Sequence, residues 1–368
     1  MVDIYNDYYK GKNVLITGGL GFIGSNLAHA LAKLEHGPSN IIIVDSLIQN
    51  LGADSVNPND FNIAGLENKA DVYKGPEWDL RNTSNIEKLI RNNGCDCIFN
   101  LAGSVAHNLS DEDPEWDRSI NYDSHISLIK ACKNALLKGE LKIVFAGTRD
   151  QYGKNIPKEN LPVRESQVII EASDTQGIHK YAAELFHLKH NGLQNGSGLT
   201  LKTVSLRLTN IYGPRQQMID PDRGFVPWFI RTAIDNGEIK LWGGGRSLRD
   251  LLFVDDAVEA FLAAMSSENT NGNAYNVSNY IRFVAKPEDR CGNVVYVGDV
   301  AKMITLLAGS GSCVEVDYPE DKKIKEIGHY CGDATKLYDS VAWHPKTSLE
   351  EGLLKTIEFY MKNKPHYW

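Results

Sequence analysis

A glycine-rich stretch near the start of the chain constrains the fold more than any other feature. Residues 17–24 read TGGLGFIG and lie between a short apolar run at 14–16 and a helical pattern at 26–34. This order predicts a strand, a glycine turn and a helix. Such a turn brings backbone N–H groups and a helix N-terminus up to a pyrophosphate. The alternative is a glycine turn that binds nothing. The contacts expected with a dinucleotide are Gly18, Gly21, Phe22, Ile23 and Gly24.

An acidic residue indicates which dinucleotide binds. A second apolar run, at 41–44, ends in Asp45. A carboxylate at this position accepts hydrogen bonds from both ribose hydroxyls of an adenosine and repels a 2′-phosphate. We therefore expect NAD rather than NADP.

Composition excludes several classes of protein. The 368 residues carry a formal net charge of -8, which argues against nucleic acid as the main partner. No apolar stretch reaches the roughly 18 residues that a membrane span needs. Residues 1–12 lack the basic flank and apolar core of a secretory signal, so a cytoplasmic location is expected. The six cysteines show no CxxC spacing, which favours reduced packing thiols, and no metal is expected.

Apolar runs alternate with helical patterns along the first 209 residues. This alternation predicts an α/β fold with a doubly wound parallel sheet of the Rossmann type. Ligands of such a sheet lie beyond the carboxyl ends of its strands. The strands are expected at 14–16, 41–44, 71–74, 96–101, 141–146 and 203–208.

The pattern loosens after residue 209. Residues 210–252 and 280–368 are expected to form a smaller C-terminal α/β lobe that binds the substrate. Residues 253–279 are expected to return to the first domain, 1–209, as a helix and a strand. The segment 47–69 is rich in Asn, Asp and Gly and is expected to be a long loop.

With these motifs in order, the chain resembles the extended short-chain dehydrogenase/reductases over nearly its whole length. Within them it is most similar to the NAD-dependent nucleotide-sugar epimerase/dehydratase family. The resemblance implies NAD as the cofactor, which TGGLGFIG and Asp45 match. It also implies further cofactor contacts at the adenine and at the nicotinamide ribose. These are Asp79 and Leu80 for the adenine, and Leu101, Ala102 and Gly103 for the ribose.

Two later segments imply a nucleotide-diphosphate sugar as the substrate. Asn210, in RLTNIYGP, looks like the family asparagine that contacts a nucleotide diphosphate, and Arg249, in RDLLFVDD, looks like the diphosphate-binding arginine. Cofactor binding alone explains neither segment. Ser104, Thr148 and Arg215 complete the expected substrate contacts.

The catalytic pattern of the family is altered in this chain. Family members pair a Ser or Thr at a strand end with Tyr-x-x-x-Lys on the next helix. Thr148 fits the first position and Lys180 fits the lysine, which also holds the nicotinamide ribose, but Gln176 occupies the position of the tyrosine. The spacing of four places residues 176 and 180 on one helical face. Glutamine can orient a hydroxyl but has no proton to exchange near neutral pH.

Another group must therefore take the proton of the reacting hydroxyl. Asp150 is the best candidate, because the dehydratase branch of the family carries an acidic residue at the corresponding position. His107 and His179 are weaker candidates.

Three functions are compatible with this pattern. The favoured one is an NAD-dependent nucleotide-sugar epimerase that oxidises a ring carbon transiently. A 4,6-dehydratase or a 4-oxidase of the same family is the second; Asp150 favours a dehydratase, whereas Arg149 stands where dehydratases usually carry an acid. The third is a binding protein that keeps NAD and a nucleotide sugar but has lost turnover through Gln176.

The helices expected at 120–137 and 173–193 resemble the pair that family members pack into a four-helix bundle between subunits. A homodimer is therefore expected. Four tryptophans are expected to serve only in packing. They are Trp116, Trp228, Trp242 and Trp343.

Overall fold

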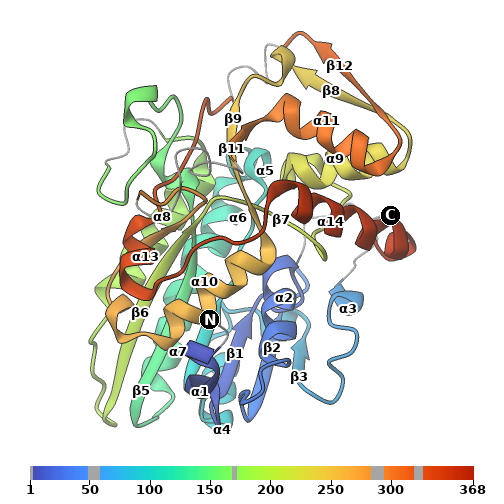
Figure 1. Ribbon diagram of the computed structural model, residues 1–368. Helices are drawn as coiled ribbons and strands as arrows, with labels where there is room; N and C mark the ends of the chain where they lie inside the picture. The colour runs from blue at the N-terminus through green and yellow to red at the C-terminus, as the bar shows by residue number, and fades with distance from the viewer. Residues whose placement is uncertain (1–2, 49–58, 168–171, 283–293, 319–325) are drawn as a thin grey trace.

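A parallel sheet of seven strands forms the centre of the protein, shown by a computed structural model (Figure 1). The structure describes residues 3–48, 59–167, 172–282, 294–318 and 326–368. The strand order is β10-β6-β5-β4-β1-β2-β3, which confirms the predicted doubly wound α/β fold. The strands are β1 (Asn13–Thr17), β2 (Asn40–Asp45), β3 (Asp71–Lys74), β4 (Cys97–Asn100), β5 (Gly139–Thr148), β6 (Leu199–Leu208) and β10 (Ala274–Val277).

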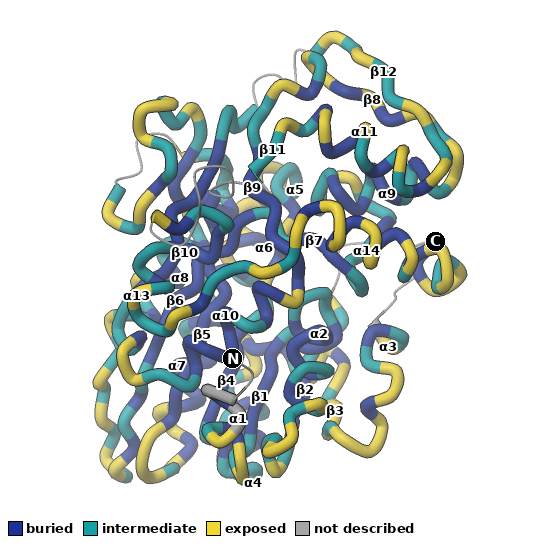
Figure 2. The backbone as a smooth tube through the Cα atoms, viewed as in Figure 1, coloured by how far each residue is buried: buried dark blue, intermediate teal, exposed yellow. Residues whose placement is uncertain are grey.

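The central strands are apolar on both faces because helices cover both sides of the sheet. Leu15 of β1 packs with α4 and α7, whereas Val14 and Ile16 pack with α2 and α10. All three side chains are fully buried, and Figure 2 shows this centre in dark blue. The covering helices are α2 (Phe22–Leu31), α4 (Thr83–Asn93), α7 (Ser124–Asn134) and α10 (Val254–Ser266).

A smaller lobe, at the upper right of Figure 1, contains two short sheets. One has the order β11-β9-β7 and the other pairs β12 with β8. The strands are β7 (Asn210–Tyr212), β8 (Glu238–Trp242), β9 (Leu248–Phe253), β11 (Val294–Tyr296) and β12 (Ser312–Val316). The main helices are α9 (Phe225–Ile234), α11 (Val297–Ala308) and α14 (Leu349–Asn363).

The two helices expected to form the dimer bundle are shorter than predicted. The first begins with a π turn at Ser119–Asp123 and continues as α7. The second, α8, spans Thr175–Lys189, because Asp174 caps its start by accepting a hydrogen bond from Gly177 N at 2.7 Å. It ends before Gly192, which has a φ of +76°.

Other expectations fall partly outside the described residues. Within the predicted loop 47–69, the described part contains the short helix α3 (Asn59–Asn62). Cys291 also lies outside, while the other five cysteines are free thiols. In the described parts of the chain, we find no helix whose length and apolar character would let it cross a membrane.

Candidate active site

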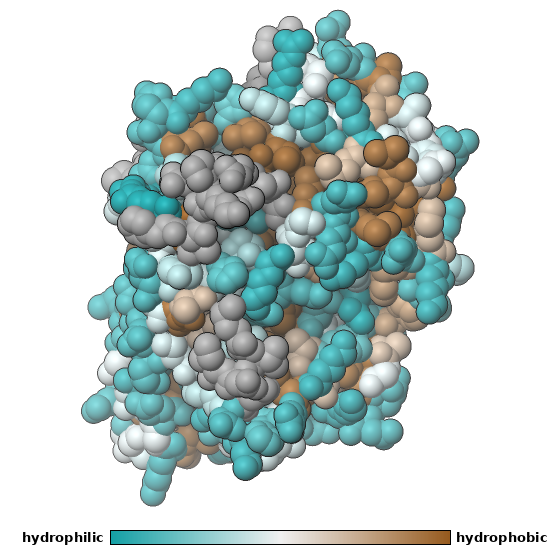
Figure 3. Space-filling view, viewed as in Figure 1, coloured by the Kyte–Doolittle hydropathy of each residue, from teal (hydrophilic) through white to brown (hydrophobic). Residues whose placement is uncertain are grey.

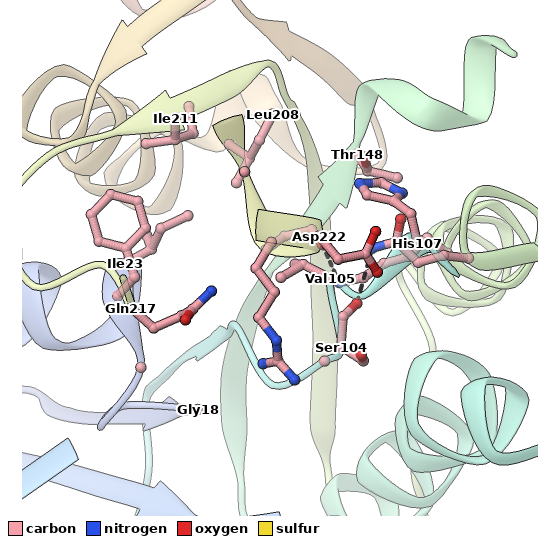
Figure 4. A pocket seen from close by; sticks show the side chains of 18 of the residues that line it. Gly18, Ile23, Ser104, Val105, His107, Thr148, Leu208, Ile211, Gln217 and Asp222 are labelled. Atoms are coloured by element: carbon pink, nitrogen blue, oxygen red, sulfur yellow. Dashed lines mark hydrogen bonds between the residues drawn. The ribbon is translucent and has the colours of Figure 1, made fainter. Parts of the chain in front are cut away.

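A cavity of about 840 Å³ lies over the carboxyl ends of the large sheet and under the small lobe. Thr17, Asp45 and Thr148 line it at the ends of β1, β2 and β5. On the other side it is lined by Gln217 and Asp222, in the segment between β7 and α9 (Figure 4). The cavity therefore occupies the position that this topology favours for ligands.

The glycine turn is closely packed in the way a dinucleotide requires. A Cβ on Gly18, whose φ is +65°, would lie 2.9 Å from Ala102 N, and a Cβ on Gly24 would overlap Gly18 O. Gly21 precedes α2 without a side-chain cap. The first N–H groups of α2 are therefore available to an anion. All five predicted contacts of this turn line the cavity.

Asp45 lies at the end of β2, beside the glycine turn. One carboxylate oxygen accepts from Leu20 N at 3.1 Å, and the other accepts from Leu47 N at 2.9 Å. Burial raises the pKa of this carboxyl group despite these two bonds. The backbone thus holds Asp45 in place, with lone pairs left for ribose hydroxyls.

At the predicted adenine end, Asp79 and Leu80 both line the cavity. The Asp79 carboxylate binds Arg81, with Arg81 Nη2 at 2.7 Å and Nε at 2.9 Å. Sequence reasoning missed this arginine, although its spacing of two residues permits the contact. The adenine role of Asp79 stays a prediction.

A buried hydrogen-bond network holds the segment that follows β4. Thr17 Oγ1 accepts from the N–H groups of Leu101 and Ala102, each at 3.2 Å, and donates to Asn100 Oδ1 at 2.8 Å. The Asn100 amide contacts His125 Nδ1 at 2.8 Å and His187 Nε2 at 3.2 Å. Residues 101–103 therefore pass the cavity on a fixed path.

Lys180 reaches this segment from α8. Its Nζ donates to Ala146 O at 3.1 Å, and burial lowers the pKa of the amine to about 8. A Cβ on Gly103 would lie 2.8 Å from this Nζ, so a larger residue there would displace the amine. The geometry brings the predicted lysine and the predicted ribose segment together.

Thr148 and Asp150 meet at the end of β5. Thr148 Oγ1 donates to Asp150 Oδ2 at 2.6 Å, and Arg149 Nη2 lies 3.1 Å from Asp150 Oδ1. Burial opposes ionisation of Asp150, but the charges of Arg149 and His107 prevail and lower its pKa. Asp150 is therefore a carboxylate near neutral pH, and it orients the Thr148 hydroxyl.

Gln176 lies in the position predicted for the tyrosine and is 2% exposed. Its Nε2 donates to Ser104 O at 2.9 Å, and its Oε1 has no hydrogen-bond partner among the described residues. Tyr152 does not replace the missing phenol. Its hydroxyl donates to Asn276 Oδ1 and accepts from Arg207 Nη1, each at 2.6 Å.

The predicted substrate residues differ in what they contact. Asn210 Oδ1 is buried and has no hydrogen-bond partner among the described residues, and its substrate role stays a prediction. Arg249 pairs with Glu326 at 2.8 Å, so a diphosphate there would compete with this carboxylate. The guanidinium of Arg215 instead donates to Asn26 Oδ1 on α2 at 2.7 Å and packs over Phe359. Its substrate role stays a prediction.

Comparison with known proteins gives the family. Residues 14–278 match the NAD dependent epimerase/dehydratase family. The chain belongs to this family. Its cofactor is NAD, and the closely packed glycine turn, Asp45 and Lys180 fit that dinucleotide. When bound, NAD supplies the hydride acceptor and donor of the reaction.

Relatives within the epimerase/dehydratase family catalyse several reactions. UDP-N-acetyl-alpha-D-glucosaminuronate decarboxylase of Bacillus cytotoxicus is 30% identical over 95% of this chain and 98% of that protein. CDP-paratose 2-epimerase of Salmonella typhi is 25% identical over 94% of this chain and 98% of that protein. The structure of UDP-glucose 4-epimerase of Thermotoga maritima with UDP-glucose has a TM-score of 0.77 and 26% identity. The match covers 96% of this chain and 99% of that one.

Two tryptophans expected to serve only in packing also line the cavity of this family member. They are Trp116 and Trp242, and Trp242 is 40% exposed. The alternation of polar and apolar residues along β8 could have indicated that Trp242 is exposed, because Trp242 shares the exposed face of Glu238 and Lys240. Trp343, by contrast, is buried as expected.

Proposed function

We propose that this family member is an NAD-dependent nucleotide-sugar epimerase. In this reaction a sugar hydroxyl loses its proton while the hydrogen on the same carbon leaves as hydride, and hydride later returns to the other face of the ring. The observation that carries the proposal is the group formed by Thr148, Asp150 and Lys180 at one end of the cavity.

Each of these residues has a defined task. Thr148 Oγ1 donates a hydrogen bond to the Asp150 carboxylate and accepts one from the Asp150 N–H at 3.2 Å, so one lone pair of Oγ1 is left to accept a hydrogen bond from the sugar hydroxyl. Lys180 is proposed to hold the nicotinamide ribose. The proton moves to Asp150 through Thr148, or to a further base that faces the same cavity.

Gln176 is proposed to bind rather than to exchange protons. Its Oε1 has no described partner and can accept a hydrogen bond from a ligand hydroxyl. A buried acceptor that is left unpaired costs free energy. A ligand hydroxyl that donates to this oxygen would therefore strengthen ligand binding.

The proposed substrate is a nucleotide-diphosphate sugar. The relatives from Bacillus cytotoxicus and Thermotoga maritima carry UDP-sugars in their names, and the relative from Salmonella typhi carries a CDP-sugar. Asn210 and Arg249 line the cavity near the small lobe, where they would meet the diphosphate.

A panel of UDP-, CDP-, GDP- and dTDP-sugars, including sugar acids, tests the proposal. Products are followed by mass spectrometry and NMR. A new stereoisomer of unchanged mass is expected. Loss of water would instead indicate a dehydratase, loss of two hydrogens an oxidase, and loss of carbon dioxide a decarboxylase. Tight binding without change would indicate a binding protein.

We also propose a homodimer through α7 and α8. Ile178 and Leu185, seven residues apart on α8, are 54% and 51% exposed. Residues at this spacing share one face of a helix, and an exposed apolar face of this kind suits a four-helix bundle. Light scattering should give the mass of a dimer, and Leu185→Glu should give a monomer. A monomeric wild-type protein would contradict this proposal.

A further inference from the structure

His107 begins α5 (His107–Glu112) and faces the cavity beside Thr148 (Figure 4). Its Nδ1 lies 2.6 Å from Asp174 Oδ2. The side chain is 40% exposed, whereas that of Asp174 is 9% exposed. Because Asp174 holds Nδ1, the other ring nitrogen, Nε2, is left to exchange a proton with a ligand.

Asp174 is itself held firmly. Its Oδ1 accepts from Gly177 N at 2.7 Å and so caps α8, while its Oδ2 holds His107. The carboxylate that orients the histidine is thus part of the helix that carries Lys180.

The backbone of Gln176, at the position of the missing tyrosine, helps to hold His107 in place. The backbone N–H of Gln176 donates to Ser110 Oγ at 3.3 Å, and Ser110 Oγ donates to His107 O at 2.7 Å. Thr175 adds two hydrogen bonds to Asp111 Oδ1, at 2.9 and 3.1 Å. The first residues of α8 therefore fix α5, and with it the histidine.

The carboxylate of Asp150 is poorly placed to be the final proton acceptor. One of its oxygens is engaged by Thr148 and the other by Arg149. No hydrogen bond to His107 Nε2 is found in the described part of the chain. In its neutral form the histidine therefore offers a lone pair on Nε2 at the same end of the cavity.

We propose that His107 is a catalytic residue that replaces the tyrosine of the family, with Asp174 as its positioning residue. The proposal rests on the proposed function. As the sugar is oxidised, the hydroxyl proton moves to Nε2 of the neutral His107 ring, the O–H electron pair forms the C=O bond, and the C–H electron pair leaves as hydride to NAD. In the return step His107 gives the proton back as hydride is restored to the carbon.

One experiment measures oxidation of the panel sugars by His107→Ala with and without added imidazole. We expect a loss of about 100- to 10,000-fold, because a positioned proton-transfer group is typically worth that much. Imidazole should restore part of the rate, which a purely structural role would not allow. Asp174→Asn can still cap the helix, but it should slow oxidation because it no longer holds His107 with a charge.

His36→Ala is the matched control. It removes an exposed histidine that pairs with Asp7 at 3.0 Å, and it should leave the rate unchanged. A wild-type rate in His107→Ala would overturn the proposal, as would a slow rate that imidazole does not raise.

A second measurement needs no sugar and so separates this proposal from the proposed function. Burial favours the neutral ring, but Asp174 and Asp150 prevail and raise the pKa of His107 to about 9. Diethyl pyrocarbonate acylates the neutral ring, so it should modify His107 of the wild type near that pH. At lower pH it should modify Asp174→Asn faster than the wild type, because the variant lacks the charge that raises the pKa of His107. His107 left unmodified while His36 reacts would overturn the proposal. A wild type that oxidises no panel sugar would overturn the proposed function, while acylation would still report whether His107 Nε2 is free and reactive.

Discussion

Thr148 Oγ1 donates to Asp150 Oδ2 at 2.6 Å, and this bond joins the last residue of β5 to the turn that follows it. The same carboxylate pairs with Arg149. The hydroxyl that is expected to meet the sugar is therefore oriented by an ionised neighbour. This arrangement is local and does not depend on the tyrosine that Gln176 replaces.

Asp150→Asn tests that orientation. The amide keeps the size of the side chain but loses the charge, and a hydrogen bond to a charged group is worth about 1.5–3 kcal/mol. We expect sugar oxidation to slow by about 10- to 100-fold, with NAD binding retained. Single-turnover kinetics measures the effect, and Asp339→Asn, at an exposed position on α13 (Thr335–Val341), is the control. An unchanged rate would remove Asp150 from the reaction.

Lys180→Met tests the buried amine. Burial holds the pKa of Lys180 at about 8, so folding already disfavours its charge, and methionine of similar length should be tolerated. We expect turnover to be lost while the circular dichroism and melting temperature stay near those of the wild type. Lys189→Met, at an exposed position of the same helix, should keep both activity and fold. Wild-type turnover in Lys180→Met would contradict the assignment.

Asp45→Ala tests the choice of cofactor. Because the carboxylate is held at the ribose position by Leu20 and Leu47, its loss should weaken NAD by about 10- to 100-fold and NADP much less. Dissociation constants for both dinucleotides, measured by fluorescence, check this. Asp71→Ala, at an exposed position on β3, should change neither value. A wild-type preference for NADP would refute the role of Asp45.

Acid should destabilise the protein through His187. Burial lowers the pKa of this histidine from 6.5 to about 3, with the charges of His190 and Lys180 acting in the same direction. The unfolded chain therefore binds a proton below about pH 6.5, while the native state binds it only near pH 3. The free energy of unfolding should fall as pH decreases between these values.

Urea unfolding at several pH values in this range measures that loss. In His187→Asn the free energy of unfolding should fall less as pH decreases. In His36→Asn, at an exposed histidine, it should fall as in the wild type. Equal slopes for the wild type and His187→Asn would show that His187 does not contribute.

Features that depend on short stretches of chain could be predicted from the sequence. The glycine turn and the buried strands have local patterns, because helices on both faces make a parallel strand continuously apolar. The resemblance to the family, rather than a local pattern, is what placed Thr148 and Lys180 at one predicted site, while the spacing of four placed only residues 176 and 180 on one helical face.

Contacts between distant residues had no such signal. His107 and Asp174 are 67 residues apart, and Arg249 and Glu326 are 77 apart. Each of these side chains is also plausible as a solvated charge, and only the packing of α5 on α8 brings the first pair together. The hydrogen bond from the backbone N–H of Gln176 to Ser110, which helps to fix α5, follows from the same packing.

The absorbance of the reduced nicotinamide tests most directly whether a ring carbon of the sugar is oxidised transiently. Enzyme loaded with NAD is mixed rapidly with the panel sugar that gives a new stereoisomer, and the signal is followed through one turnover. Transient oxidation of a ring carbon predicts that the absorbance rises and then returns to its starting value as the epimer forms. Formation of the epimer without any rise, even with substrate deuterated at the reacting carbon to slow hydride transfer, would contradict it.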